Sequence, residues 1–252
     1  MKKAFIVQAR LGSTRLPNKM VLPFYKDETV LDIIIDKLKQ SFNNIPIILA
    51  TSTNSENDIL EKRYKDRNCL VFRGSENNVL DRFCEAANFY SITHIIRVCA
   101  DNPFLDMNEL RTLMQYIENN PEKEYISFEV NNKPSIKTHY GFWVEFVSLK
   151  ALTKVKAFTE DSLYLEHVTN FIYQHRDLFD IQYILPNPKI YNHENVRMTL
   201  DTLEDFKLLS SIYEILFLKY GKDLFIDQIM DFLGNNPIYI EKMNNEIQKN
   251  IK

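Results

Sequence analysis

Residues 3–20, KAFIVQARLGSTRLPNKM, begin as an apolar run and continue into a basic loop. The run at residues 3–8 is short and rich in aromatic and β-branched side chains, which is typical of a buried strand. The loop at residues 9–20 combines a glycine, hydroxyl groups and several cations. In open parallel sheets, ligands bind beyond the carboxyl ends of the strands. We therefore predict that this loop lies where a ligand binds.

The first half of the chain repeats the strand pattern with helical patterns in between. Thr29–Ser41 and Asn78–Tyr90 place their apolar residues on one helical face. Strand-like runs occupy residues 45–51, 69–72 and 94–99. Alternation at this spacing predicts βαβ units and a parallel sheet, whose crossovers place helices on both faces. This half is typical of an α/β nucleotide-binding domain.

The second half of the chain shows a less regular order of predicted strands and helices. Its expected elements are helices at 108–119 and 161–175, strands at 125–130, 141–147, 181–185 and 195–200, and a mostly helical tail at 204–252 with breaks at Gly221 and at residues 234–237. The polar stretch at residues 131–139, NNKPSIKTH, is expected to be a lid or a substrate loop. No linker divides the chain, so we predict a single domain over residues 1–252, with a substrate or dimerisation insert at about 124–190.

Composition excludes several classes of protein. The chain has 252 residues, of which 45% are hydrophobic, and 31 Lys and Arg against 34 Asp and Glu give a net charge of −3. No whole-protein positive field would hold a nucleic acid polymer or an anionic membrane. No apolar run approaches the roughly 18 residues of a membrane span, and the N-terminus lacks a signal-peptide core, so a cytoplasmic enzyme is expected.

The number and spacing of glycines and cysteines exclude further classes of site. Only five glycines occur, and the closest two are too far apart for a dinucleotide-binding GxGxxG, a Walker loop or a lipase GxSxG. The chain has three cysteines, Cys69, Cys84 and Cys99, which form no CxxC pair and are expected to be reduced structural thiols. No Asp-x-Asp pair occurs either.

The basic loop has the composition of a phosphate-binding site. Gly12 allows a tight turn, and Ser13 offers a hydroxyl and a backbone donor. Arg10, Arg15 and Lys19 can surround a polyphosphate, since arginine makes forked contacts to phosphate oxygens and lysine supplies a compact charge. The alternative is an ordinary solvated basic loop.

Two aspartates follow predicted strands and are expected at the same edge as this loop. Asp101 comes after the strand at 94–99, and Asp201 comes after the run at 195–200. Carboxylates beside bound phosphates suit Mg²⁺, which usually takes one or two carboxylates together with phosphate oxygens. Alternatively, Asp101 turns the chain before a proline, and Asp201 competes with Thr202 to cap a helix. Together the two carboxylates and the cations are the minimum set for metal-assisted phosphoryl or nucleotidyl transfer.

The string at residues 8–19, QARLGSTRLPNK, resembles the opening motif of the cytidylyltransferase family that activates acidic sugars. It is closest in pattern to the SpsF-like branch of spore-coat polysaccharide biosynthesis, which is related to the CMP-Kdo and CMP-sialate synthetases. Further blocks resemble that branch in the same order, at residues 72–82, 97–103, 166–169 and 197–205. The resemblance covers residues from about 4 to 215.

The resemblance implies a glycosyltransferase-A-like, Rossmann-like α/β fold with a mixed sheet, binding of CTP with Mg²⁺, a small acidic acceptor and usually a homodimer. Arg10, Lys19, Asp101 and Asp201 would be catalytic, with both aspartates on the metal. The implied nucleotide contacts are Gln8, Ala9, Arg10, Gly12, Ser13, Arg15, Lys19, Arg73, Ser75, Asp81 and Arg82. The implied acceptor contacts are Glu145, Glu166, His167 and Arg197.

Two residues depart from the pattern of the family, and a third is a charged residue in a predicted strand. Trp143 stands where the branch commonly shows an aspartate, and Asn102 where relatives often carry Cys or Glu. Arg97 lies inside a predicted buried strand, where a charge is costly without a partner, so it is expected to meet a carboxylate or a phosphate. The alternatives to CMP transfer are a glycosyltransferase that uses a sugar nucleotide and a nucleotide-binding protein without turnover. The acceptor is not identified by the sequence.

Overall fold

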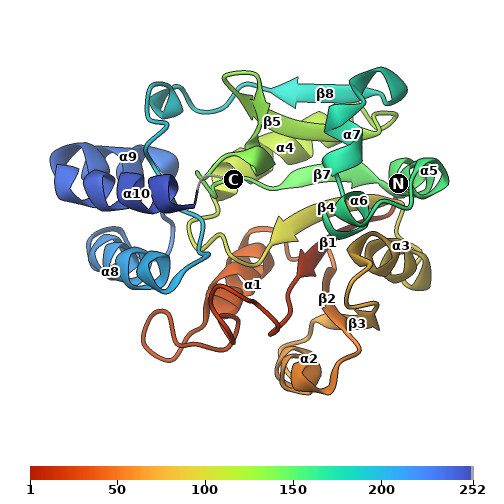
Figure 1. Cartoon of the computed structure of the whole chain (residues 1–252), viewed down its shortest axis with the longest axis horizontal. Coiled ribbons are helices and arrows are strands. Elements are labelled where there is room, and N and C mark those ends of the chain that lie inside the picture. Colours follow the sequence, from red (N-terminus) through yellow and green to blue (C-terminus); the bar gives the residue numbers. More distant parts are fainter. Residues whose placement is uncertain (251–252) are drawn as a thin grey trace.

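The computed structural model describes residues 1–250 and is built on one β-sheet with helices on both faces (Figure 1). Its parallel half contains β1 (Lys3–Gln8), β2 (Ile47–Ser52), β3 (Leu70–Gly74) and β4 (His94–Cys99). β1 pairs with both β2 and β4, and β2 pairs with β3, all in parallel. The carboxyl ends of these four strands therefore meet at one edge, as the sequence predicts.

The second half of the chain makes the sheet mixed. It adds β5 (Tyr125–Val130), β6 (Lys133–Pro134), β7 (Glu145–Ser148) and β8 (Ile181–Ile184). β7 runs antiparallel to β4 and β5, whereas β8 runs parallel to β5. The strand order is β3-β2-β1-β4-β7-β5-β6, with β8 also on β5. The predicted mixed α/β architecture is confirmed.

Two buried clusters separate the sheet from its helices, because successive side chains of a strand point to opposite faces. Phe5 and Val7 belong to one cluster and Ala4 and Ile6 to the other. The first cluster includes residues of α1 (Val30–Ser41), α2 (Asp58–Lys65), α4 (Met107–Asn119), α8 (Leu203–Tyr220), α9 (Ile226–Asn235) and α10 (Pro237–Lys249). The second includes residues of α3 (Val79–Phe89), α5 (Leu149–Phe158) and α7 (Asn170–Gln174), with α6 (Ser162–Glu166) packed at its margin.

The helical tail follows its predicted pattern. α8 is capped by Gly221 at a φ of 78°, and α9 and α10 are separated at Asn236, directly before Pro237. Short 3-10 turns occur at Ser55–Asn57, Ser135–Lys137, Arg176–Leu178 and Pro188–Ile190. Within residues 1–250, no helix is both long and apolar enough to cross a membrane.

The predicted strand at 195–200 is wrong. Its apolar residues Val196, Met198 and Leu200 are buried, but the segment pairs with loops instead of a strand. The Met198 N–H donates to the carbonyl of His139 at 2.7 Å, and the Leu200 N–H donates to the carbonyl of Asp101 at 2.9 Å. The alternating apolar residues of the sequence imitated a strand, because Val196, Met198 and Leu200 join the buried core.

The predicted helix at 161–175 is also wrong in part, because it is divided into α6 and α7. His167 ends α6, and the buried Thr169 turns its hydroxyl toward Glu145 on the sheet. The predicted strand at 141–147 begins only at residue 145. Helices α2 and α5 were not expected from the sequence. The segments at 141–145, 161–175 and 197–201 all contribute residues to one pocket beyond β4.

Candidate active site

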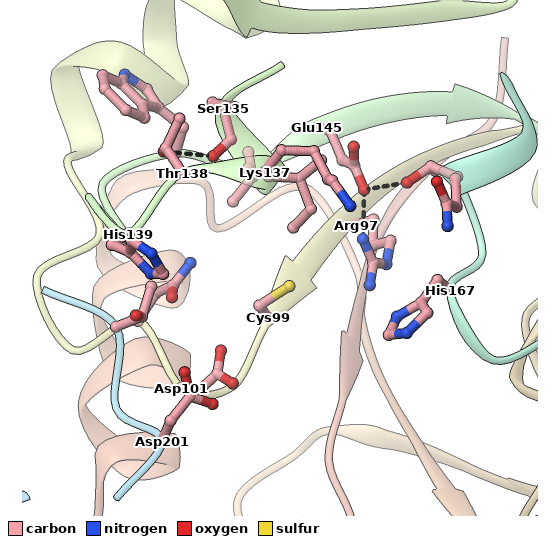
Figure 2. Close-up of a pocket in the computed structure, with 18 of the residues that line it drawn as sticks. Arg97, Cys99, Asp101, Ser135, Lys137, Thr138, His139, Glu145, His167 and Asp201 are labelled. Carbon is pink, nitrogen blue, oxygen red and sulfur yellow. Dashed lines mark hydrogen bonds and ion pairs between the residues drawn. The ribbon is translucent and has the colours of Figure 1, made fainter. Parts of the chain in front are cut away.

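A pocket of about 670 Å³ opens beyond the carboxyl end of β4 (Figure 2). Such a volume is typical of sites for small molecules. Its wall is contributed by the end of β4, by segment 135–145, by α6 and α7, and by segment 197–201. The segments that depart most from their predicted secondary structure therefore build this wall.

Gly141 allows the pocket segments to approach closely. Its φ is 64°, and a Cβ atom there would lie 2.9 Å from the carbonyl oxygen of Met198 and 3.2 Å from Oδ1 of Asn102. Any side chain would therefore force these backbones apart, in a conformation that L residues disfavour. The glycine fixes the spacing between the end of β4 and the segment that carries Asp201.

Asp101 and Asp201 lie side by side at one end of the pocket (Figure 2). The Lys19 ammonium lies between their segments, 3.2 Å from Oδ2 of Asp101 and 3.0 Å from the carbonyl oxygen of Leu200. Arg15 donates to Oδ1 of Asp201 at 2.6 Å. The structure thus brings together two carboxylates and two cations of the basic loop, as the sequence leads us to expect.

A buried guanidinium holds Asp201 in place. Arg197 donates to Oδ2 of Asp201 at 3.0 Å and makes two bonds to Asp205, at 2.8 and 2.7 Å. Burial would raise the pKa of Asp205, but the bonds from Arg197 lower it overall, so this carboxylate stays charged. Because a guanidinium can only donate, Nδ1 of His139 accepts from Arg197 at 2.9 Å. Burial and Arg197 lower the pKa of His139, which favours its neutral form.

The other end of the pocket contains a buried ion pair. Arg97 and Glu145 are cross-strand partners on β4 and β7, and the guanidinium binds the carboxylate through Nη1. Tyr125 also donates to Glu145, as does Thr169 at 2.8 Å. Burial raises the pKa of Tyr125 well above its usual value, so its hydroxyl keeps the proton that it donates. The expectation that Arg97 meets a carboxylate is confirmed.

The basic loop is held at the same sheet edge. The Leu11 N–H donates to Oδ1 of Asn57 at 2.9 Å, and Ser13 turns back to the Leu11 carbonyl at 2.7 Å. A Cβ atom at Gly12 would lie 3.1 Å from Oε1 of Glu56, so this turn also suits glycine. Arg10 lies beside it and donates to Oε1 of Glu76 at 2.8 Å.

The second motif of the resemblance shapes the loop after β3. Arg73 binds Asp58 and Glu61 on α2, away from the pocket. The fully buried Arg82 donates to the carbonyl of Ser75 at 2.7 Å, and Asp81 forms an ion pair with Lys156. The Ser75 hydroxyl accepts from the N–H of Asn78 at 3.0 Å. In this structure, the contacts of these residues stabilise the loop after β3 and the helices beside it.

The pocket gathers only some of the expected site residues. Those that line it are Arg15, Asp101, Glu145, His167, Arg197 and Asp201. Those outside its lining are Gln8, Ala9, Arg10, Gly12, Ser13, Lys19, Arg73, Ser75, Asp81, Arg82 and Glu166. Lys19 still reaches Asp101 directly, and Glu166 is 3.6 Å from Arg10, so the basic loop and the pocket form adjoining parts of one edge.

Sequence reasoning missed several pocket residues. They are Cys99, Lys137, Thr169, Asn170, Tyr173 and Thr199. The polar stretch at 131–139 was a signal for Lys137, and this stretch does form part of the wall. Cys99, which the sequence predicts to be a structural thiol, lies beside Asp101 and faces the pocket. No periodicity distinguishes such residues, because they lie at element ends.

The donor set fits a metal that is shared with a ligand. No group of three or more Cys, His, Asp and Glu side chains in residues 1–250 could hold a metal ion by itself. Asp101 and Asp201 supply two hard oxygen donors beside cations that suit phosphate. Mg²⁺ is commonly bound in this way, through one or two carboxylates together with phosphate oxygens and water.

Comparison with known proteins identifies the family. A family model described as cytidylyltransferase matches residues 4–243. Protein MJ1063 of Methanocaldococcus jannaschii is 34% identical over 249 residues, which cover 99% of this chain and 97% of that protein. The spore coat polysaccharide biosynthesis protein SpsF of Bacillus subtilis is 32% identical, with 92% and 94% covered.

A solved structure supports the same assignment. A cytidylyltransferase from Leptospira borgpetersenii serovar Hardjo-bovis is 27% identical and has a TM-score of 0.84, with 95% of this chain and 97% of that chain covered. Agreement in sequence and in fold over nearly the whole length confirms the resemblance based on the ordered motifs. The chain therefore belongs to the cytidylyltransferase family of nucleotidyltransferases.

Proposed function

We propose that this enzyme transfers CMP from CTP to an acidic sugar or a related acceptor in surface glycan biosynthesis, with Mg²⁺ bound and pyrophosphate released. The observation that carries the proposal is the position of Asp101 and Asp201 beside each other, with Lys19 and Arg15 on them, at one end of a pocket. Family membership supports the use of CTP.

The proposed chemistry is attack of an acceptor oxygen on the α-phosphorus of CTP, in line with the departing pyrophosphate. A metal held by Asp101 and Asp201 would neutralise phosphate charge when bound. Arg10, Arg15 and Lys19 offset negative charge as it moves onto the leaving group. Arg15 and Lys19 contact the two aspartates directly, so they are placed to exchange those contacts for phosphate oxygens.

The pocket supplies the acceptor side of the reaction. Its wall from segment 135–145 and from α6 and α7 surrounds a space next to Asp101, where an acceptor oxygen could approach. Rigid placement of two reactants is itself a large contribution to catalysis. We further propose that the enzyme acts as a homodimer in the cytoplasm, where CTP is available.

The decisive assay is pyrophosphate release with each of the four nucleoside triphosphates, against keto-acid sugars, phosphosugars and phosphonates. CTP with one of these acceptors should release pyrophosphate. Asp101→Asn should lower kcat by about two orders of magnitude or more, because it removes a metal oxygen ligand and a negative charge. Its fold should persist, since the Asp101 carboxylate contacts Lys19 at a partly exposed position and the substitution leaves the backbone bond from Leu200 in place.

Asp66→Asn is the matched control, because Asp66 is exposed at the end of α2 and lies outside the pocket. It should leave kcat unchanged. Near wild-type pyrophosphate release by Asp101→Asn would disprove the metal assignment. Consumption of a sugar nucleotide without pyrophosphate would instead indicate a glycosyltransferase, and binding of CTP without any product would indicate a protein without turnover.

A further inference from the structure

The end of the pocket away from the aspartates contains an arginine with unused donors. Arg97 and Cys99 lie on the same face of β4, since alternate strand residues point the same way, and Asp101 follows in the turn beyond. At about 3.3 Å per residue, the Cα atoms of Arg97 and Asp101 are at most about 13 Å apart. The pocket lining includes all three, so one ligand can contact both ends.

Within residues 1–250, the Arg97 guanidinium is held through Nη1 alone. Its side chain is 9% exposed, and Nη1 binds Glu145. Among residues 1–250 it makes no other hydrogen bond, and its Nε is buried without a partner. Burial alone would lower its pKa, but nearby negative groups including Glu145 raise it, so the guanidinium stays charged. Figure 2 shows it between Glu145 and His167.

Within residues 1–250, Glu145 accepts from Arg97 through Nη1 only. Its two oxygens also accept from Tyr125 and Thr169. Asn170, which also lines the pocket, has a buried Oδ1 without a partner in the described part of the chain. Buried polar atoms without partners are costly and uncommon in native proteins. This end of the pocket therefore offers a ligand the donors of Arg97, beside an Asn170 oxygen that can only accept.

Lys137 adds a second positive charge to the same end of the pocket. Its exposed side chain lines the pocket, and Figure 2 shows it extending on the side of Arg97 and Glu145. It makes no ion pair or hydrogen bond with any other residue between 1 and 250. Since Glu145 balances Arg97, this lysine leaves its end of the pocket positive, whereas Asp101 and Asp201 lie at the opposite end.

We propose that Arg97 and Lys137 form the subsite that binds the anionic group of the acceptor, a carboxylate, phosphate or phosphonate. This inference rests on the proposed function, because it assumes that the acceptor occupies this pocket. Arginine suits the role through its planar fork and lysine through a compact charge. Glu145 then acts as a positioning residue, which orients the guanidinium instead of contacting the acceptor.

The test uses the full chain with CTP and Mg²⁺, and the acid acceptor that gives the fastest pyrophosphate release. Lys137→Ala should raise the KM for the acceptor about tenfold and leave the KM for CTP unchanged, because the lost charge acts on the acceptor alone. Lys133→Ala is the matched control, since Lys133 is exposed on the neighbouring β6 and does not line the pocket. It should leave both constants within about twofold.

Two further comparisons separate binding of the anion from a structural effect. The uncharged amide or ester of the same acceptor should have a KM raised like that of the variant, and Lys137→Ala should add little to it. Arg97→Lys keeps the charge beside Glu145 but loses the fork, so it should raise the KM for the acceptor while CTP binding persists. If that variant does not fold, Lys137→Ala and the uncharged acceptor decide the question.

The inference is overturned if Lys137→Ala leaves the acceptor KM unchanged, or if acid and amide are used equally well. A binding measurement keeps it testable without turnover. Keto-acid sugars, phosphosugars and phosphonates, each tested alone, should include one that raises the midpoint of thermal unfolding of the wild type but not of Lys137→Ala. No rise with any of them would also overturn it. Acid binding without pyrophosphate release would contradict the proposed function only.

Discussion

At the residue scale, Trp143 gives the pocket wall an aromatic side chain. It stands where the resemblance leads us to expect an aspartate. Its ring stacks on that of Phe128, with 5.7 Å between the ring centroids. Its indole N–H donates to Oε2 of Glu109 at 2.9 Å. Burial raises the pKa of Glu109 to about 7, although the bond from Trp143 opposes the rise. A pocket wall that would have been charged is therefore aromatic.

The shifted carboxyl of Glu109 predicts a pH dependence of stability. Its folded pKa lies above its unfolded value, so the folded state holds more protons between about pH 4.5 and 7, and stability from this group falls as pH rises through that range. Glu109→Gln cannot ionise and still accepts from Trp143. Relative to the variant, the wild type should lose about 2 kcal/mol of unfolding free energy between pH 5 and 8, measured by urea denaturation.

Glu122→Gln provides the comparison for Glu109, because Glu122 is exposed. Its difference from the wild type should be the same at both pH values. If the difference between Glu109→Gln and the wild type were also constant, the pKa of Glu109 would not be raised.

The place of a single residue could be predicted where a charged side chain follows a strand that is recognisable in the sequence. Asp101 and Lys19 follow strands that are plain in the sequence, so their meeting could be foreseen. The roles of Lys137 and Asn170 could not be assigned, because only the folded chain shows what surrounds each of them. Arg73 was expected near the nucleotide, but its ion pairs with α2 could not be read from a motif.

At the scale of elements, the start of α8 decides which side chain serves the pocket. Asp201 and Thr202 both suit a helix N-cap. The structure gives the position to Thr202, whose hydroxyl accepts from the N–H of Asp205 at 3.1 Å, and the Asp205 carboxylate accepts from the Thr202 N–H in return. This capping box leaves the carboxylate of Asp201 available to Arg15 and the pocket.

The cap can be tested by its effect on stability. Thr202→Ala removes the hydroxyl from the first turn of α8, and also its 3.1 Å bond to Glu246 on α10, so it should lower the unfolding free energy by about 1–2 kcal/mol. Thr202→Ser keeps the hydroxyl and should lose only a few tenths of a kcal/mol. Urea denaturation measures both. Equal losses in the two variants would show that the methyl group matters instead of the cap.

Whole elements were predictable in the parallel half and less so in the second half. Strands β1, β2 and β4 are buried on both faces, so their apolar runs are distinct. The segment at 195–200 has the same alternation without a strand partner, which no local pattern reveals. The break between α6 and α7 arises because Thr169 bonds to Glu145 across the pocket, a contact that depends on tertiary structure.

At the scale of the whole molecule, the net charge of −3 conceals a local separation of charge. The basic loop supplies Arg10, Arg15 and Lys19 from the first 20 residues, while Asp201 comes from the last quarter of the chain. A triphosphate bound between them would connect both halves. Such a ligand binds the folded state and not the unfolded chain, so it stabilises the protein by mass action.

CTP with Mg²⁺ should therefore raise the midpoint of thermal unfolding. At a concentration of about 100 times Kd the stabilisation is about 2.7 kcal/mol, which corresponds to roughly 5–10 °C for a chain of this size. Differential scanning fluorimetry measures the shift. EDTA should remove most of it if the metal joins the aspartates to the phosphates. A shift of the same size in EDTA would contradict that arrangement.

The bond between Arg15 and Asp201 joins positions 186 residues apart, and Phe24 and Ser210 make another contact over the same separation. During synthesis, the basic loop therefore leaves the ribosome long before Asp201, the carboxylate that pairs with Arg15, has been added to the chain. Partly translated copies would hold strands but no complete reaction centre. Under the proposed mechanism, activity requires the last quarter of the polypeptide to fold back onto its beginning.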